Sequence, residues 1–253
     1  MDEPLIDDGV AELASLLDIR PTEFLRRTTG RETFAWTWPP GLRVIVKRTR
    51  QTRAAWPSRR DVRPGGRREH ENLVALAADG LPVPRAVTWC EERGRLLLRP
   101  ARSVVVMERI EHRENLKERL ARCDEAERRS WSRELVRIVA RLHARGWRHR
   151  DLYLQHFLIP APEEAGARRL VLIDVGRARR ARELSRRWIV KDLAALAHSA
   201  PACVGARERL AFLARYLSAR GIGDRDERRR FARAILAKAA RMRAHVPRDE
   251  RGV

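Results

Sequence analysis

The segment His-Arg-Asp-Leu-Tyr-Leu-Gln-His-Phe-Leu, residues 149–158, decides the fold that this sequence predicts. It follows a helical pattern with apolar residues on one face between residues 135 and 142, and it leads into an apolar run typical of a strand. Further along, Ile173-Asp174 ends a second apolar run. A carboxylate in such a place is costly to bury without a cation. We therefore expect Asp174 to have a cation partner. We also expect Asp151 and Asp174 to belong to one functional site.

Two upstream residues complete an order of motifs that kinases share. Lys47 ends a predicted strand, and Glu69 lies near the start of a predicted helix. In phosphoryl transfer, a lysine holds the phosphates, a helix glutamate orients that lysine, one carboxylate binds magnesium and another aligns the acceptor hydroxyl. Alone, Lys47 would be interpreted as a solvated edge charge and Glu69 as helix-surface charge. The order favours an ion pair, with Glu71 as an alternative partner.

The distribution of elements predicts an α+β, protein-kinase-like fold with two lobes. Residues 1–107 are expected to form a small N-lobe with an antiparallel sheet, and residues 108–253 a helical C-lobe. Strands are predicted at 34–38, 42–47, 96–98, 104–107 and 170–173, with Pro39-Pro40-Gly41 as the first turn. Helices are predicted at 67–79, from Asp124 to near Gly146, and at 192–199, 206–219 and 225–243.

Composition limits the kinds of partner. The net charge of +21 indicates an anionic partner: nucleic acid, an anionic membrane surface or a phosphorylated substrate. No recognition motif supports nucleic acid, and aromatic content is only 6%. Three widely spaced cysteines show no zinc or disulfide pattern and suggest a reducing compartment. The acidic first residues argue against a secretory signal, and no apolar run approaches the roughly 20 residues of a membrane span.

The motifs together resemble the bacterial lipopolysaccharide core kinases, which comprise the heptose kinases and the Kdo kinases. The resemblance spans residues 42–199 and is most specific in residues 149–158. It also includes three shorter motifs, which are Arg68-Glu69, Ile173-Asp174-Val175-Gly176-Arg177-Ala178, and Arg187-Trp188 before Lys191-Asp192-Leu193. His156 stands where protein kinases carry a metal-binding asparagine, as in the heptose-kinase branch, and this favours heptose as the acceptor.

The resemblance implies a role for each matching residue. Asp151 corresponds to the catalytic aspartate, and Asp174 to the magnesium-binding aspartate. Lys47 corresponds to the lysine that binds the ATP phosphates, and Glu69 to its partner. His156 would contact metal or phosphate, and a phosphate hydrogen bond is the preferred interpretation because imidazole is a less natural magnesium ligand than an oxygen donor. His149 and Asp192 would support the catalytic loop.

One departure concerns the nucleotide. No Gly-x-Gly-x-x-Gly segment precedes Lys47, and Thr28-Thr29-Gly30-Arg31 is a reduced phosphate-covering loop. The implied activity is transfer of the ATP γ-phosphoryl group, with Mg²⁺, to a sugar hydroxyl of a lipopolysaccharide (lipid A-core) acceptor at the cytoplasmic face of the inner membrane.

Several alternatives remain open at the level of sequence. They are a Kdo kinase, a protein or small-molecule kinase of the same fold, and an inactive nucleotide-binding module or a nucleic-acid binder. Arginines of residues 225–243, together with Arg177, Arg179, Arg180 and Arg182, are candidates for peripheral binding to an anionic membrane, although such charges usually form a solvated face.

Overall fold

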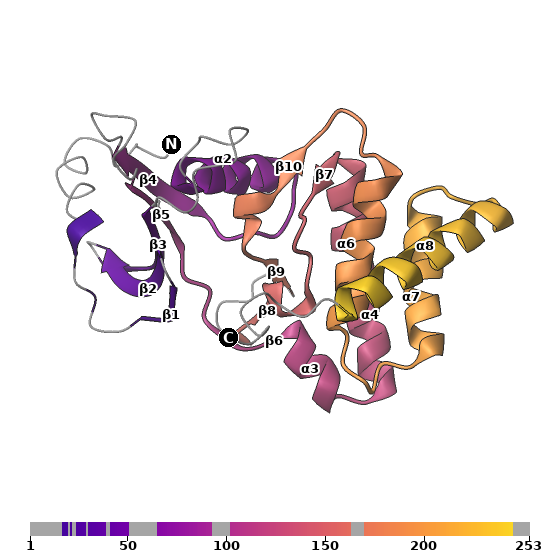
Figure 1. The fold of residues 1–253 in the computed structure, drawn as a ribbon. Coiled ribbons are helices and arrows are strands. Elements are labelled where there is room, and N and C mark those ends of the chain that lie inside the picture. Colours follow the sequence, from indigo (N-terminus) through magenta and orange to yellow (C-terminus); the bar gives the residue numbers. More distant parts are fainter. Residues whose placement is uncertain are drawn as a thin grey trace, which may run out of the picture. The chain divides into compact units, whose positions relative to one another are not determined.

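The structure is a computed structural model (Figure 1), and it describes residues 17–19, 21, 24–28, 30–38, 41–50, 65–92, 102–162 and 170–244. The chain divides into two compact units, Met1–Ala78 with Pro84–Arg109, and Asp79–Val83 with Ile110–Val253. The expected turn at residues 39–40 and strand at 96–98 lie outside the described residues.

The first unit ends at Arg109 rather than at residue 107, and the division also differs from the expected one at Asp79–Val83, which belongs to the second unit. Hydrogen bonds explain the second difference: the Leu172 amide donates to the Pro82 carbonyl at 2.7 Å, and Arg141 Nη1 donates to the Gly80 carbonyl at 2.8 Å. Gly80 has a positive φ of 74°, which suits the left-handed end of the preceding helix. The helix therefore stops where expected, but residues 79–83 after it belong to the second unit.

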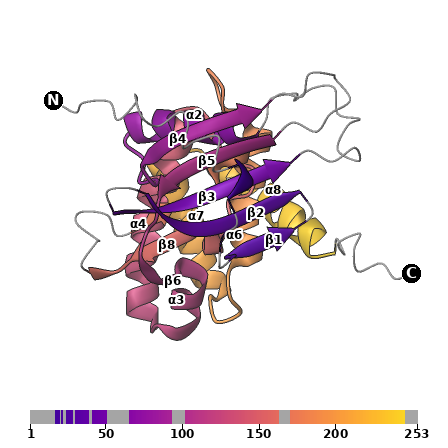
Figure 2. The same cartoon turned by 90° about the vertical axis from the view of Figure 1, so that its left-hand side faces the viewer.

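The first unit contains a five-stranded antiparallel sheet in the order β1-β2-β3-β5-β4 (Figure 2). Its strands are β1 (Arg26–Thr28), β2 (Arg31–Trp38), β3 (Leu42–Arg50), β4 (Ala86–Glu92) and β5 (Arg102–Glu108). The first long hairpin and the strand at 104–107 match the sequence-based expectation, whereas β4 was not expected.

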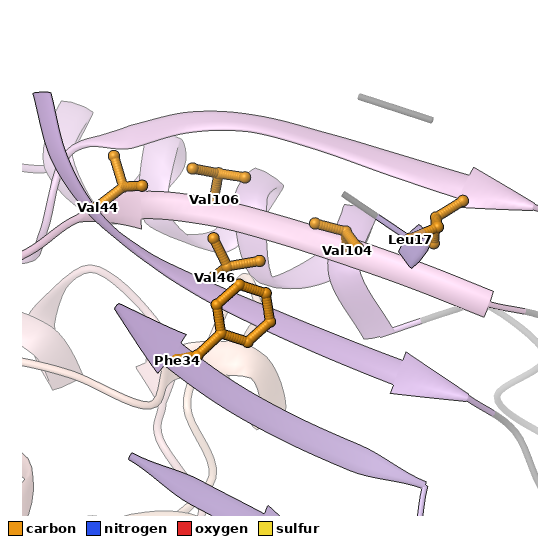
Figure 3. Close-up of a cluster of buried hydrophobic side chains, with 6 residues drawn as sticks. All are labelled: Leu17, Phe34, Val44, Val46, Val104 and Val106. Atoms are coloured by element: carbon orange, nitrogen blue, oxygen red, sulfur yellow. The ribbon is translucent and has the colours of Figure 1, made fainter. Parts of the chain in front are cut away.

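Alternation along β3 decides where Lys47 points. Val44 and Val46 are buried on one face, where they join Phe34, Val104 and Val106 in an apolar cluster (Figure 3). Because successive side chains of a strand point to opposite faces, Lys47 lies on the other face, opposite Val105 in the register of β3 and β5. That face carries helix α2 (Gly65–Ala78), which packs on β4 and β5.

Helix α2 buries one stripe, formed by Gly66, Glu69, Asn72, Leu73 and Leu76. Its spacing of three and four residues places Glu69 on the same side as the two leucines. At Gly66 a Cβ would lie 2.6 Å from the Val104 carbonyl oxygen, so only glycine allows this approach to β5. The sequence thus holds Glu69 against the sheet.

The second unit is mainly helical. Four longer helices dominate, α4 (Glu125–Ala144), α6 (Arg186–Ser199), α7 (Ala206–Ala219) and α8 (Arg225–Arg243), with α4 packed on α7 and α6 on α8 (Figure 1). The shorter elements are β6 (His112–Asn115), α3 (Leu116–Arg122), β7 (Trp147–Arg148), η2 (Leu154–His156), β8 (Phe157–Pro160), β9 (Val171–Leu172), η3 (Val175–Arg177) and β10 (Arg179–Arg180). The strand expected at 170–173 is thus only two residues long.

Two small sheets, β6-β8-β9 and β7-β10, flank the loop at residues 149–153. Gly146 turns the chain from α4 into β7 with φ of 80°, and a Cβ there would lie 2.1 Å from the Ala181 carbonyl oxygen. A side chain at this position would push β7 away from β10. No helix in the described part of the chain has the length and apolar character needed to cross a membrane.

Candidate active site

The first group of candidate residues is an ion pair in the first unit. Lys47 Nζ donates to Glu69 Oε1 at 2.6 Å, and the two side chains are 23% and 11% exposed. Glu71, the alternative partner, instead pairs with Arg67 at 2.7 Å on the exposed side of α2. Lys47 of the sheet therefore has a specific acidic partner on helix α2, and that partner is Glu69.

The second group lies in the second unit, around the loop at residues 149–153. Asp192 of α6 is fully buried, and its two carboxylate oxygens accept hydrogen bonds from the backbone amides of His149 and Arg150 at 2.7 and 2.8 Å. Arg150 has φ of 77°, a left-handed conformation that costs a non-glycine residue about 1 to 3 kcal/mol. The buried carboxylate holds this strained turn and places Asp151 beside it.

His149 anchors the same loop from inside the unit. Its ring is fully buried, and Nε2 donates to the Ile173 carbonyl at 3.1 Å. Burial lowers the pKa of His149, against a weaker opposing effect from Asp192. The ring is therefore neutral at pH 7, and its bond to Ile173 ties the loop to the segment that carries Asp174.

Asp174 follows β9 with φ of 60°, and its carboxylate is 48% exposed. Arg150 and Asp174 are the two described non-glycine residues with positive φ, and such strain tends to occur at functional sites. His156 Nε2 lies 3.8 Å from Asp174 Oδ2. The catalytic-loop and strand-end motifs are thus neighbours in space.

The tautomer of His156 follows from its partner. Nδ1 lies 2.8 Å from the Asp151 carbonyl oxygen, which can only accept, so Nδ1 carries the hydrogen. In the neutral ring, Nε2 is then an acceptor directed toward Asp174. A hydrogen bond from Nε2 to phosphate, the interpretation preferred from sequence, would require the protonated ring.

The same geometry fits a metal ion. Metal-bound histidines commonly donate their second ring N–H to a backbone carbonyl, as His156 does here. Within the described residues, no group of three or more His, Cys, Asp or Glu side chains could hold a metal alone. Magnesium in kinases is usually held by one or two carboxylates together with substrate phosphates. The Asp174 carboxylate fits that partial set of ligands, and the His156 ring lies next to it.

Arg177 is a functional candidate that sequence reasoning placed elsewhere. Its Nη1 lies 3.0 and 2.8 Å from the two carboxylate oxygens of Asp151. Arg180 likewise donates to the Arg145 carbonyl at 3.2 Å. Both were expected among membrane-binding arginines, yet both contact their own unit. The position of Arg177 in the sequence, shortly after Asp174, does not by itself indicate its contact with Asp151.

A buried polar chain behind Asp192 was also missed. His143 Nδ1 and the Tyr216 hydroxyl are 2.6 Å apart, and His143 Nε2 lies 3.5 Å from Asp192 Oδ2. Burial raises the pKa of Tyr216, so its hydroxyl keeps its proton. Residues of α4 and α7 therefore support the carboxylate of α6 that holds the loop. Sequence reasoning treated His143 as an ordinary core histidine.

Comparison with known proteins shows which family has a sequence of this kind. The model of the lipopolysaccharide kinase (Kdo/WaaP) family matches residues 51–216. The chain belongs to this family. The match includes Glu69, Asp151, Asp174 and Asp192, but Lys47 precedes it, so the assignment of Lys47 depends on its ion pair with Glu69.

Two relatives give more detail. The lipopolysaccharide core heptose(I) kinase WaaP of Pseudomonas aeruginosa is 40% identical over 85 residues. That segment covers 32% of this chain and 32% of the relative, so the match spans about a third of the curated relative. A solved structure of WaaP in complex with acyl carrier protein is 26% identical with a TM-score of 0.69, and the match covers 91% of this chain and 92% of that one. The expected α+β, protein-kinase-like fold is confirmed.

Proposed function

We propose that this lipopolysaccharide kinase family member transfers the γ-phosphoryl group of ATP to a hydroxyl of a heptose in the lipopolysaccharide inner core. The main observation that supports this reaction is the conformation of the Asp151 loop, which the buried Asp192 carboxylate holds in a strained turn. The identity with a heptose(I) kinase supports the acceptor.

Each residue has a distinct task in this proposal. Asp151 aligns the acceptor hydroxyl and takes its proton. Lys47, oriented by Glu69, holds ATP phosphates. Asp174 would hold magnesium, which neutralises phosphate charge when bound, and His156 would contact metal or phosphate beside it. The supporting residues His149 and Asp192 keep the loop in place.

The acceptor is tested by offering the purified chain labelled ATP with core oligosaccharides that contain or lack heptose. We expect label in the heptose-containing acceptor, and at least about a hundredfold less with Lys47→Met, which removes the phosphate-binding charge. Arg133→Gln, an exposed arginine of α4, is the matched control and should label normally. Equal labelling of both acceptors would contradict the heptose assignment.

The other outcomes of this experiment correspond to the competing functions. Label on the Kdo residue would indicate a Kdo kinase. Transfer to soluble proteins or small alcohols, independent of the core, would indicate a kinase with another acceptor. Absence of transfer despite ATP binding would indicate an inactive nucleotide-binding module.

A second proposal concerns a protein partner. Because the similar WaaP structure is a complex with acyl carrier protein, we infer that this chain also binds an acyl carrier protein. A cavity of about 430 Å³ in the second unit favours this partner, since it is lined by apolar side chains of α3, α4, α6, α7 and α8, including Leu116, Leu135, Leu196, Phe212 and Ile235. Leu210 and Leu236 also line it and are 58% and 60% exposed, an apolar patch suited to an acyl chain.

The substitution Leu210→Asp is expected to weaken binding of an acylated carrier protein more than tenfold, because it removes about 2 kcal/mol of apolar burial and adds a charge. Isothermal titration with acylated and unacylated carrier protein measures this. Val74→Asp, at a similarly exposed apolar residue of α2, is the matched control. Equal affinity of the acylated and unacylated forms would contradict a role for the cavity.

A third proposal is peripheral binding to an anionic membrane through α8. This helix exposes several arginines that have no partner among the described residues, including Arg225, Arg230 and Arg233. Each basic residue near an anionic surface contributes about 1 kcal/mol, so the triple change of these three to glutamine should weaken binding about a hundredfold. Co-sedimentation with anionic vesicles measures this, and binding that is unaffected by salt or by the triple change would refute it.

A further inference from the structure

Four basic side chains gather around Trp188 of α6, close to Asp151. The Arg148 guanidinium carbon lies 4.1 Å from the ring centroid and Lys191 Nζ lies 5.4 Å from it. Arg150 and Arg187 each lie 5.7 Å from the same centroid. We call these residues the Trp188 cluster. Attraction of each cation to the ring is opposed by repulsion among four like charges.

Few carboxylates are left to balance this charge. Asp192 already accepts from two backbone amides, and Asp151 is paired with Arg177. Among the described residues, the guanidinium groups of Arg148 and Arg150 have no hydrogen-bond or ion-pair partner, and the Nε atom of each is buried and unpaired. A merely solvated face would leave these atoms in water. The cluster is instead partly buried and electrostatically incomplete.

The electrostatic environment agrees with the geometry. Burial lowers the pKa of Arg148, and neighbouring Arg150 and Arg179 lower it further. Burial and Arg150 also lower the pKa of Lys191, whereas Asp151 raises it, so this ammonium lies within electrostatic reach of Asp151. An anion placed here would relieve the repulsion among these groups. Guanidinium groups suit carboxylate and phosphate because their planar donors match the oxygens.

We propose that the Trp188 cluster binds an anionic group, a carboxylate or phosphate, of the acceptor saccharide and thereby positions its hydroxyl at Asp151. This inference rests on the proposed acceptor phosphorylation. Arg150 precedes Asp151 in the chain, so an anion bound by the cluster is close to the carboxylate that aligns the hydroxyl. Anion binding would also explain why position 191 carries a lysine in a chain with four lysines and many arginines.

Binding is tested without catalysis. The indole N–H signal of Trp188 is assigned by its loss in Trp188→Phe, because the chain has seven tryptophans, and inorganic phosphate is titrated against chloride at constant ionic strength. We expect a saturable shift whose midpoint rises at least tenfold in Arg148→Gln and in Lys191→Gln, and stays unchanged in Arg133→Gln. Apart from the assignment with Trp188→Phe, the wild-type titration depends on no variant. A shift no larger than with chloride would overturn the proposal.

Acceptor binding is tested by a second measurement. In Lys191→Gln the KM for the acceptor should rise at least tenfold, with the KM for ATP unchanged. Dephosphorylated and carboxyl-reduced acceptors show which anion is bound. With the acceptor that lacks the bound anion, the KM of the wild type should rise to that of Lys191→Gln. If phosphate shifts Trp188 but both neutralised acceptors keep the wild-type KM, the cluster binds an adventitious ion only and the proposal is wrong.

The two proposals fail in different ways. If no acceptor is phosphorylated, the proposed function fails, yet intact and neutralised core acceptors can still be titrated against the Trp188 signal. Binding of the intact acceptor alone would then support the subsite without the reaction. Equal binding of both would overturn the subsite whatever the reaction is.

Discussion

Replacing Asp151 by asparagine is expected to lower kcat for phosphoryl transfer by about 10²- to 10⁴-fold, the usual contribution of a positioned general base. Asparagine keeps the size of the side chain but cannot accept the proton of the acceptor hydroxyl. The carboxylate is 19% exposed and paired with Arg177, so its loss leaves an exposed guanidinium rather than a buried one. Steady-state kinetics with labelled ATP and core acceptor measure the effect.

The control for this substitution is stability. Because the Asp151 carboxylate contacts a half-exposed arginine, Asp151→Asn should change the free energy of unfolding by less than about 0.5 kcal/mol. A variant that is folded and inactive would support a chemical role. Retention of more than a tenth of wild-type kcat would show that another group aligns the hydroxyl.

Replacing Asp192 by alanine should have the largest effect on stability. It removes the acceptor of two buried amides, and each unpaired buried group costs about 1 to 3 kcal/mol. It also leaves His143 without the carboxylate 3.5 Å away. We expect a loss of about 3 kcal/mol or more, measured by urea denaturation, together with loss of transfer activity because the strained turn at Arg150 is released.

Two further variants separate these effects. Asp192→Asn retains one acceptor oxygen and should give an intermediate loss. Asp226→Ala, at an exposed position of α8, removes the same charge and should stay within about 0.5 kcal/mol of the wild type. A loss below about 1 kcal/mol for Asp192→Ala would mean that the loop does not depend on this carboxylate.

Local signals explain why parts of the fold were predictable. Helices α7 and α8 have the expected bounds, and α8 begins where the Asp224 carboxylate accepts from the Glu227 amide at 2.7 Å. Such caps and apolar periodicity involve residues a few positions apart, so they are visible in sequence. Strand β4 and helix α3 were missed. The side chains of β4 are all partly exposed, which gives no alternation, and α3 has only seven residues.

For the site, the order of motifs in the sequence made Lys47, Glu69, Asp151 and Asp174 candidates, because phosphoryl transfer requires those residue types on successive elements. The family resemblance added Asp192. The order of motifs could not decide which glutamate pairs with Lys47, because that depends on the buried stripe of α2 facing the sheet.

Only the tertiary structure showed the contact of His156 Nδ1 with the Asp151 carbonyl, the contact of Arg177 with Asp151 and the gathering of basic groups around Trp188. Each of these depends on the direction of side chains from segments up to about 40 residues apart. Those directions are set by packing and hydrogen bonds between elements, not by the local pattern of residues.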